Sequence, residues 1–197
     1  MKIFFLFALV IGVQSLYLSQ DYTANITATY RNIGPFGSIR SWQGLVKNDW
    51  THQRKFFKGE IKAGVLWYTV DQNVTEIANY YKTESYVFND THCDLAFPFS
   101  KFIHAPFSWL EDPDIAESTN TTKCPGTNSA KYYELVSPTF QLCLDSEGLP
   151  TYLHRIQYRV EYNIHFSSFS FGAGDDEDYR IPKICKRAAP PVVREKE

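Results

Sequence analysis

The sequence predicts a mostly β protein built from curved antiparallel sheets with little helix. Aromatic residues make up 16% of the chain, with 15 Phe and 13 Tyr, and aromatic side chains favour strands over helices. Apolar and polar residues alternate with a period of two along several segments, as in a strand with one buried face. The chain contains no heptads and no repeat of fixed period, which argues against coiled coils and solenoids.

The first residues have the order of a secretory signal peptide. Met1-Lys2 supplies a positive charge, residues 3–13 form a compact apolar run, and the small residue Ser15 follows, as signal peptidase requires. The rival interpretations are a membrane anchor or a buried N-terminal strand, but the run is shorter than the about 20 residues that span a bilayer. We therefore predict a signal peptide at residues 1–15, with cleavage after Ser15 or as late as Ser19.

Length and charge indicate a single exported domain. We predict one β domain at residues 20–185, long enough to bury a core, and a disordered tail at residues 186–197 that is rich in Pro and charged residues. The net charge of −2 gives no indication of a nucleic-acid partner or of electrostatic membrane binding. Because no second long apolar segment follows the signal, we expect no transmembrane anchor.

Alternating and aromatic runs predict strands along most of the domain. In the first half we expect strands at residues 24–31, 54–61, 64–70, 75–82 and 83–89, with a turn at Asp71-Gln-Asn73. In the second half we expect strands at residues 132–136 and 140–144, and a turn at Gly148 that leads into a return strand.

The clearest strand covers residues 156–166. Every even position from Ile156 to Phe166 is apolar or aromatic and every odd position is polar, which predicts one long strand with a buried and a solvated face. The alternation shifts at Ser167-Ser168, after which Phe169 and Phe171 are the apolar positions. We expect a β-bulge or a bend at these serines.

Residues 97–109 do not have a strand pattern. Their apolar side chains follow no period, and two inner prolines limit any helix to about one turn. We expect a packed irregular segment that covers one face of the sheet as a plug or lid. The polar residues 112–131, rich in Thr, Ser and Asn, predict a surface loop that is tethered by Cys124.

Cysteines and glycosylation sequons support export. The four cysteines are Cys93, Cys124, Cys143 and Cys185. An even number in an exported chain predicts two disulfides, and no pair has the close Cys-x-x-Cys spacing of a zinc site. The acceptor asparagines, each followed two residues later by Thr, are Asn25, Asn73, Asn89 and Asn120. We therefore expect a secreted, disulfide-bonded glycoprotein.

The sequence contains no catalytic motif. It has no Gly-x-Ser-x-Gly elbow, no phosphate-binding glycine loop and no His-Glu-x-x-His motif. We therefore expect that the protein is not an enzyme. The acidic residues Asp175, Asp176 and Asp178 are weak candidates for binding Ca²⁺, but they lack the ligand spacing of an EF-hand loop. A solvated acidic turn is the simpler interpretation, so we expect no cofactor unless it is Ca²⁺.

These features follow one another in a fixed order. A signal peptide comes first, followed by a strand meander and a cysteine just after a hairpin. A cysteine in a later strand, a long aromatic strand and an acidic turn follow, and the sequence Ile-Pro-x-x-Cys comes directly after that turn. The segments concerned are Trp67-Tyr-Thr-Val-Asp71, Asn89-Asp-Thr-His-Cys93, Cys143-Leu-Asp, residues 158–171 and Asp178-Tyr-Arg-Ile-Pro-Lys-Ile-Cys185. In spacing and residue type, residues 24–185 resemble the ependymin-related secreted glycoproteins.

The resemblance implies a fold, a location and partners. The fold is that of bacterial lipoprotein carriers (LolA-like), in which antiparallel sheets curl into a half-barrel or sandwich with a deep apolar pocket. Members of the family are secreted or lysosomal glycoproteins, associated with lipids or other hydrophobic ligands, with calcium and with homodimer formation. The resemblance implies the same partners here, in the extracellular space or in the lysosomal lumen.

The resemblance also implies a disulfide pattern. In the family the cysteine after the hairpin pairs with the one near the C-terminus, which here gives Cys93–Cys185. Cys143 matches a strand cysteine whose usual partner lies near the mature N-terminus, where this chain has none. The chain has Cys124 instead, so the resemblance leaves Cys124–Cys143 as the second bridge.

The functional hypothesis is a non-catalytic carrier of a lipid or another hydrophobic small molecule. The aromatic face of the 156–166 strand offers a surface for such a ligand, although ordinary core packing is the simpler role for any one of its residues. The candidate pocket residues are Trp67, Phe102, Trp109, Tyr158, Val160, Tyr162, Ile164 and Phe166. The alternative is a secreted β-sandwich with a filled core that serves adhesion or matrix contact, with or without calcium.

Overall fold

The structure, a computed structural model, describes residues 18–32, 39–65, 68–96, 106–126, 128–157 and 159–187. These residues form one antiparallel sheet of 11 strands in the order β6-β5-β4-β3-β2-β1-β11-β10-β9-β8-β7. Within them, helix is confined to short 3-10 turns. The predicted mostly β, antiparallel fold with little helix is confirmed, and the strands belong to one open sheet rather than to two.

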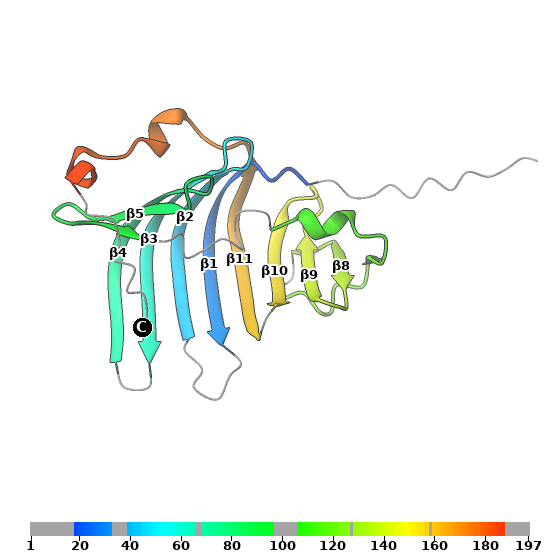
Figure 1. The fold of residues 1–197 in the computed structure, drawn as a ribbon. Coiled ribbons are helices and arrows are strands. Elements are labelled where there is room, and N and C mark those ends of the chain that lie inside the picture. The colour runs from blue at the N-terminus through cyan, green and yellow to red at the C-terminus, as the bar shows by residue number, and fades with distance from the viewer. Residues whose placement is uncertain are drawn as a thin grey trace, which may run out of the picture.

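The strands follow the chain in two meanders. The first contains β1 Tyr22–Asn32, β2 Ile39–Asp49, β3 Arg54–Val65, β4 Tyr68–Asn79, β5 Glu84–Phe88 and β6 Cys93–Ala96. The second contains β7 Ala116–Ser118, β8 Lys131–Leu135, β9 Thr139–Leu144, β10 Pro150–Gln157 and β11 Val160–Phe171. The 3-10 turns are η2 Ser108–Glu111, η3 Asp176–Tyr179 and η4 Lys183–Arg187. Figure 1 shows β1–β4 and β11 side by side as the longest strands, with the smaller β8 and β9 at one edge.

Strands β1 and β11 join the two meanders in the middle of the sheet. Tyr22 lies opposite Phe171 and Asn32 opposite Val160, so the two strands pair along their whole length. Asn25 lies opposite Ser168 and Ile26 opposite Phe166, which leaves Ser167 as an extra residue on β11. The β-bulge predicted at these serines is confirmed.

The prediction of one long strand at residues 156–166 is wrong. Gln157 pairs with Val160, so the chain reverses between them and divides the segment into β10 and β11. Arg159 has a φ of 64°, a conformation that Gly or Asn usually adopts in such two-residue turns. Because neither Tyr158 nor Arg159 is a usual turn residue, the alternation of the segment gave no sign of the reversal. Ile156 consequently lies on the opposite face of the sheet from Val160.

The prediction of a turn at Asp71-Gln-Asn73 is wrong for a related reason. These residues lie within β4, where Asp71 pairs with Lys62 of β3, and the reversal falls between Val65 and Tyr68 instead. The strand expected at residues 64–70 therefore crosses that reversal. β2 is absent from the predicted strands, and the loop expected at residues 112–131 contains the three-residue strand β7.

The sheet has an inner face that carries the core and a solvated outer face. On β1, the alternate residues Tyr22, Ala24, Ile26 and Ala28 are buried on the inner face. The intervening Asn25, Thr27 and Thr29 are exposed on the outer face. Register then assigns every paired residue of the neighbouring strands to one face or the other.

Residues from outside the sheet cover part of the inner face. Phe107, Trp109 and Leu110 are buried there together with Leu18. The Phe107 ring lies 5.9 Å from that of Tyr22, and Trp109 stacks on Phe140 at 5.2 Å. Residues 106–109 of the predicted plug thus pack on one face, with helix limited to the single turn η2, whereas residues 97–105 lie outside the described part of the chain.

Both predicted disulfides are present. Cys93 of β6 is bonded to Cys185 of η4, and Cys124 is bonded to Cys143 of β9. Residues 172–185, here called the strap, run from the end of β11 across one end of the sheet (Figure 1), with η3 against β3 and η4 against β6. The first bridge therefore ties the segment after the last strand to the far edge of the first meander.

The predicted signal peptide at residues 1–15 lies outside the described residues. Of the predicted tail, Lys186 and Arg187 belong to η4, and residues 188–197 lie outside the described residues.

Strands β2 and β3 approach closely at a pair of glycines. Gly44 and Gly59 lie opposite each other. A Cβ on Gly44 would lie 2.3 Å from the Lys58 carbonyl oxygen, and one on Gly59 would lie 2.1 Å from that of Gln43. Glycines within strands mark such close approaches and allow a sheet to curl.

We expect Gly44→Ala to destabilise the fold by about 1–3 kcal/mol or more, because the added methyl meets backbone that cannot rotate away. The matched control is Gln43→Ala, the neighbouring exposed position on the outer face. Urea unfolding of both variants measures the difference. Equal stability of Gly44→Ala and the unsubstituted protein would contradict the close approach.

Removal of the two disulfides should have unequal effects. The Cys93–Cys185 bridge spans 92 residues and the Cys124–Cys143 bridge spans 19. In the chain-entropy account, a loop of about 100 residues contributes about 4.7 kcal/mol and one of about 15 residues about 3 kcal/mol. We expect the double variant Cys93→Ala/Cys185→Ala to lose more unfolding free energy than Cys124→Ala/Cys143→Ala. The reverse order in denaturant unfolding would contradict this.

Candidate functional site

A row of large side chains crosses the inner face at the end of the sheet where β10 turns into β11. Neighbouring strands place Phe140 opposite Arg155, Arg155 opposite Tyr162, and Tyr162 opposite Tyr30. The Arg155 guanidinium carbon lies 4.8 Å from the centre of the Phe140 ring, and the Tyr30 and Tyr162 rings meet edge to face at 5.1 Å. We call these four residues the aromatic row.

The aromatic row is less buried than the core beside it. Arg155, Tyr162 and Tyr30 are half-buried, whereas Phe140 is buried under Trp109. Burial, followed by the electrostatic effect of Tyr30, raises the pKa of Tyr162 to about 12, against the opposing effect of Arg155. Its hydroxyl therefore stays protonated at neutral pH. The row combines apolar ring surface, hydroxyl donors and one positive charge.

The apolar surface continues from the row towards β3 and β4. Trp42 of β2 is buried and meets the Tyr30 ring edge to face at 6.0 Å. Ile61 of β3 and Val74 of β4 are half-buried and pack against the core. An extended apolar molecule that lies across the strands would meet these side chains in turn.

The predicted pocket residues differ in where the structure places them and in how far they are buried. Val160, Tyr162, Ile164 and Phe166 share the inner face of β11, as register requires. Ile164 and Trp109 are buried within the core, whereas Val160, Tyr162 and Phe166 are half-buried. Trp67, Phe102 and Tyr158 lie outside the described residues. The sequence did not single out Arg155 or Tyr30. Arg155 is polar, and the alternation that includes Tyr30 indicated a strand but not which strand would be its neighbour.

The opposite end of the inner face holds a buried ion pair. Lys55 Nζ lies 2.6 Å from a carboxylate oxygen of Glu76, and the two side chains are 2% and 0% exposed. The Ser85 hydroxyl donates to the other Glu76 oxygen at 2.7 Å. This arrangement joins β3, β4 and β5, and its charges neutralise each other. No pattern in the sequence indicated that these two charged residues point inwards.

Two of the predicted glycosylation sites lie on the outer face of the sheet and two lie in loops. Asn25 lies on β1 and Asn73 on β4, while Asn89 follows β5 and Asn120 follows β7. All four side chains are exposed. The Asn89 side-chain oxygen accepts hydrogen bonds from the backbone N–H groups of Thr91 and His92, both at 2.9 Å. The four acceptors are thus accessible from solvent.

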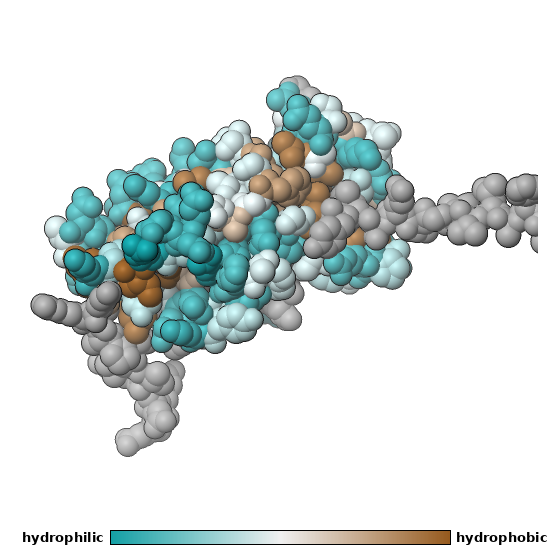
Figure 2. Space-filling model, turned by 90° about the horizontal axis from the view of Figure 1, so that it is seen from above, coloured by the Kyte–Doolittle hydropathy of each residue, from teal (hydrophilic) through white to brown (hydrophobic). Residues whose placement is uncertain are grey.

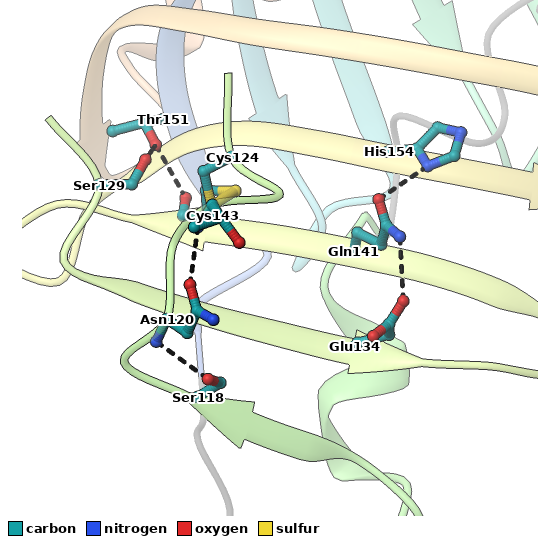
Figure 3. The surroundings of a disulfide bond; sticks show 10 residues. Ser118, Asn120, Cys124, Ser129, Glu134, Gln141, Cys143, Thr151 and His154 are labelled. Atoms are coloured by element: carbon teal, nitrogen blue, oxygen red, sulfur yellow. Dashed lines mark hydrogen bonds between the residues drawn. A yellow bond between two sulfur atoms is a disulfide. The ribbon is translucent and has the colours of Figure 1, made fainter. Parts of the chain in front are cut away.

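A polar cluster lies on the outer face beside the Cys124–Cys143 bridge (Figure 3). Gln141 lies between His154 and Glu134: its oxygen faces His154 Nδ1 at 3.1 Å, and its nitrogen donates to Glu134 at 3.0 Å. Lys123 donates to Glu134 at 2.7 Å and thereby lowers the pKa of that carboxyl. These contacts join β8, β9 and β10, so we assign the cluster a structural role.

Of the three acidic residues that the sequence offers for Ca²⁺, Asp176 and Asp178 anchor the strap, and Asp175 caps η3. Asp178 accepts a hydrogen bond from Lys47 at 2.6 Å, and Asp176 pairs with Arg54. Arg54 also pairs with the buried Asp49 at 2.6 Å and lies over the Tyr179 ring at 4.2 Å. Among the described residues no three acidic, His or Cys side chains are grouped to hold a metal ion. The acidic turn therefore docks the strap onto β2 and β3.

The strap end differs in character from the end that holds the aromatic row. Seen from above in Figure 2, hydrophilic residues cover most of its coloured surface, and apolar residues are confined to small separate patches. Lys55, Lys47 and Arg54 each have a carboxylate partner there at 2.6 Å. A buried ion pair contributes little net stability, but loss of one partner is costly. The basic side chains at the strap end are thus paired with carboxylates.

No family model and no curated protein matches this sequence. No helix among the described residues is long and apolar enough to cross a membrane.

The ion pairs of the strap predict that the free energy of unfolding decreases in acid. Hydrogen bonding by Lys47 lowers the pKa of Asp178. Burial opposes ionisation of Asp49, but hydrogen bonds from His52 and Arg54 outweigh it and lower that pKa as well. Both carboxylates bind protons more weakly in the folded than in the unfolded state. Their contribution is therefore complete above the ordinary Asp pKa of 3.8 and is lost as pH falls through the lower folded values.

We expect Asp178→Asn to reduce this acid sensitivity. Urea unfolding of the variant and of the unsubstituted protein, from pH 7 down to pH 3, measures the unfolding free energy at each pH. The two curves should differ most at neutral pH and converge in acid. Curves that stay parallel through this range would show that the Asp178 ion pair does not contribute.

Proposed function

We propose that this protein binds a lipid or another apolar small molecule on the inner face of its sheet, without catalysing a reaction. The observation that carries the proposal is the half-buried aromatic row, which continues as apolar surface towards β3 and β4. An open sheet with one apolar face leaves room for a ligand that a closed, filled barrel does not. The resemblance to the ependymin-related glycoproteins supports the same ligand class.

Burial of the apolar chain would provide the binding free energy. Each methylene group transferred from water contributes about 0.8 kcal/mol, and aromatic ring faces add contacts beyond their area. The tyrosine hydroxyls at the rim of the row would hydrogen-bond the polar end of the ligand, so that the ligand need not bury an unsatisfied polar group.

We further propose that the protein acts as a glycoprotein in the extracellular space or in the lumen of an acidic organelle. Two disulfides suit an oxidising compartment. The exposed sequon asparagines on β1 and β4 would direct glycans to the outer face, where they would not obstruct the inner face.

One observation favours the alternative, a secreted interaction protein. β5 pairs with β4 only from Thr75 to Asn79, and no strand among the described residues pairs with the preceding part of β4 on that side. Two open hollows of about 380 and 280 Å³ lie there, lined in part by Asn73 and Asn89. An open strand edge is able to accept a strand from another protein.

A neutral fluorescent hydrocarbon, diphenylhexatriene, distinguishes the two functions. We expect its emission to rise on binding the deglycosylated protein and to fall when an unlabelled lipid displaces it. Tyr162→Ala should weaken binding roughly threefold to tenfold, because one ring of the row is lost. Thr29→Ala, an exposed outer-face change on β1, is the control and should have no effect.

Absence of any emission change at saturating probe, with the fold intact by circular dichroism, would falsify the carrier proposal and favour the interaction protein. Binding that Tyr162→Ala leaves unchanged would place the apolar site elsewhere on the molecule.

A further inference from the structure

Two of the sequon asparagines lie together where β5 separates from β4. The two strands pair as far as Thr75 and Phe88, and Asn73 precedes that last pair on β4 while Asn89 directly follows it. Both asparagine side chains are exposed, and both line the two open hollows of about 380 and 280 Å³. A group attached to either asparagine would therefore lie at the wall of these hollows.

A turn at Asn89 leaves the edge of β4 open. The Asn89 side-chain oxygen accepts hydrogen bonds from the backbone N–H groups of Thr91 and His92, and the Asn89 N–H donates to the His92 carbonyl at 3.0 Å. The chain thereby turns into β6, which pairs with β5 and not with β4. Among the described residues, no strand pairs with residues 68–74 of β4 on this side.

This open edge lacks the features that usually protect one. Lysine, proline and β-bulges hinder pairing at exposed edges. Residues 68–74 contain neither Lys nor Pro, but they include Thr69 and Val70, which favour strands. Their one charged side chain, Asp71, lies 3.4 Å from Lys62 of β3, and the register with β3 has no bulge. The edge would therefore pair with another strand unless a further group covered it.

The lining of the two hollows suits a sugar. The side chains of Phe88 and Val74 are half-buried and supply apolar surface, while Gln72, His92 and Asp94 are exposed and supply hydrogen-bonding groups. A pyranose ring has an apolar C–H face, which packs on aromatic rings, and a rim of hydroxyl groups. Such a ring is able to use both kinds of lining.

Covalent attachment makes weak contacts sufficient. The first N-acetylglucosamine of a glycan on Asn73 would be joined to a side chain of the lining itself. Its contacts with the hollow would be intramolecular, and their effective concentration would be high. A glycan is also bulky and hydrophilic, so a strand that approached β4 would have to displace it.

We propose that the N-linked glycan of Asn73 lies in these hollows and covers the open edge of β4, with the glycan of Asn89 beside it. The first sugar, and not the outer branches, occupies the hollow. Glycosylation thereby keeps the edge from pairing with a second copy of the chain. This inference goes beyond the carrier proposal and does not depend on it, because it concerns the edge of the sheet and not its inner face.

Variants without these two sequons test the inference. The protein is produced in cells that attach N-linked glycans, and mass spectrometry of its peptides shows which asparagines carry them. We expect Thr75→Ala/Thr91→Ala, which keeps both asparagines, to raise the mass measured by light scattering roughly twofold over that of the unsubstituted protein, through pairing of two copies. Two matched controls should leave the mass unchanged. Thr75→Ser/Thr91→Ser retains both sequons, and Asn25→Gln/Asn120→Gln loses the same number of glycans at sites that do not line these hollows.

Enzymatic treatment of the folded, unsubstituted protein separates cover by the first sugar from a general effect of glycan bulk. Endoglycosidase H leaves one N-acetylglucosamine on each asparagine that carries a high-mannose glycan, whereas peptide-N-glycosidase F removes the whole glycan. We expect the trimmed protein to keep its mass and the fully deglycosylated protein to self-associate. In the associated form, hydrogen exchange of the backbone amides of residues 68–74 should slow, because they gain a strand partner.

The outcomes decide for or against the covered edge. Absence of a glycan from Asn73, or an unchanged mass after complete deglycosylation, would overturn the inference. Self-association of the trimmed protein, or equal association of Asn25→Gln/Asn120→Gln, would show that glycan bulk acts without a seat in the hollow. Association that leaves exchange of residues 68–74 unchanged would place the contact elsewhere and refute the covered edge as well. Binding of diphenylhexatriene is measured separately, so failure of the carrier proposal leaves these outcomes intact.

Discussion

The pairing of β1 with β11 is the contact on which the rest of the structure depends. Each meander is a series of hairpins that close short loops, whereas this ladder joins residues 22–32 to residues 160–171 and closes almost the whole domain. Such long-range contacts carry the largest loop-closure cost. Without them the chain would have two small sheets with open edges in place of one continuous face. The Cys93–Cys185 bridge acts on the same closure, since it links the far edge of the first meander to the segment after β11.

The aromatic row exists only because of this pairing. Tyr30 belongs to the first meander, whereas Tyr162, Arg155 and Phe140 belong to the second. The bulge at Ser167 shifts the parity of β11, so that Phe166 and Phe169 both pack inwards on Phe107, at 6.4 and 5.9 Å. Because side chains alternate between the two faces of a sheet, the aromatic residues of β1 and β11 lie on the same face, although the two strands are far apart in sequence.

The sequence predicted correctly those structural elements that are marked by a pattern of neighbouring residues. Alternation and aromatic content were sufficient for a mostly β, antiparallel fold, and the break in alternation located the bulge at Ser167-Ser168. The short polar turn before Pro150 was also evident, because Gly148 has a φ of 82° that glycine allows. The turns near residues 66 and 159 were missed, since no Gly, Asn, Asp or Pro marks them. The disulfide pattern came from a resemblance to other chains rather than from spacing.

The sequence by itself determined that this protein is a mostly β chain with an even number of cysteines, four sequons and no catalytic motif. The tertiary structure decided which strands are neighbours, which of the charged residues point inwards, and that Arg155 shares a row with Tyr30. The physical reason is that period-two alternation specifies two faces but not which face of which strand meets another. Only the register between β10, β11 and β1 brings a cation and two tyrosines from distant parts of the chain onto one surface.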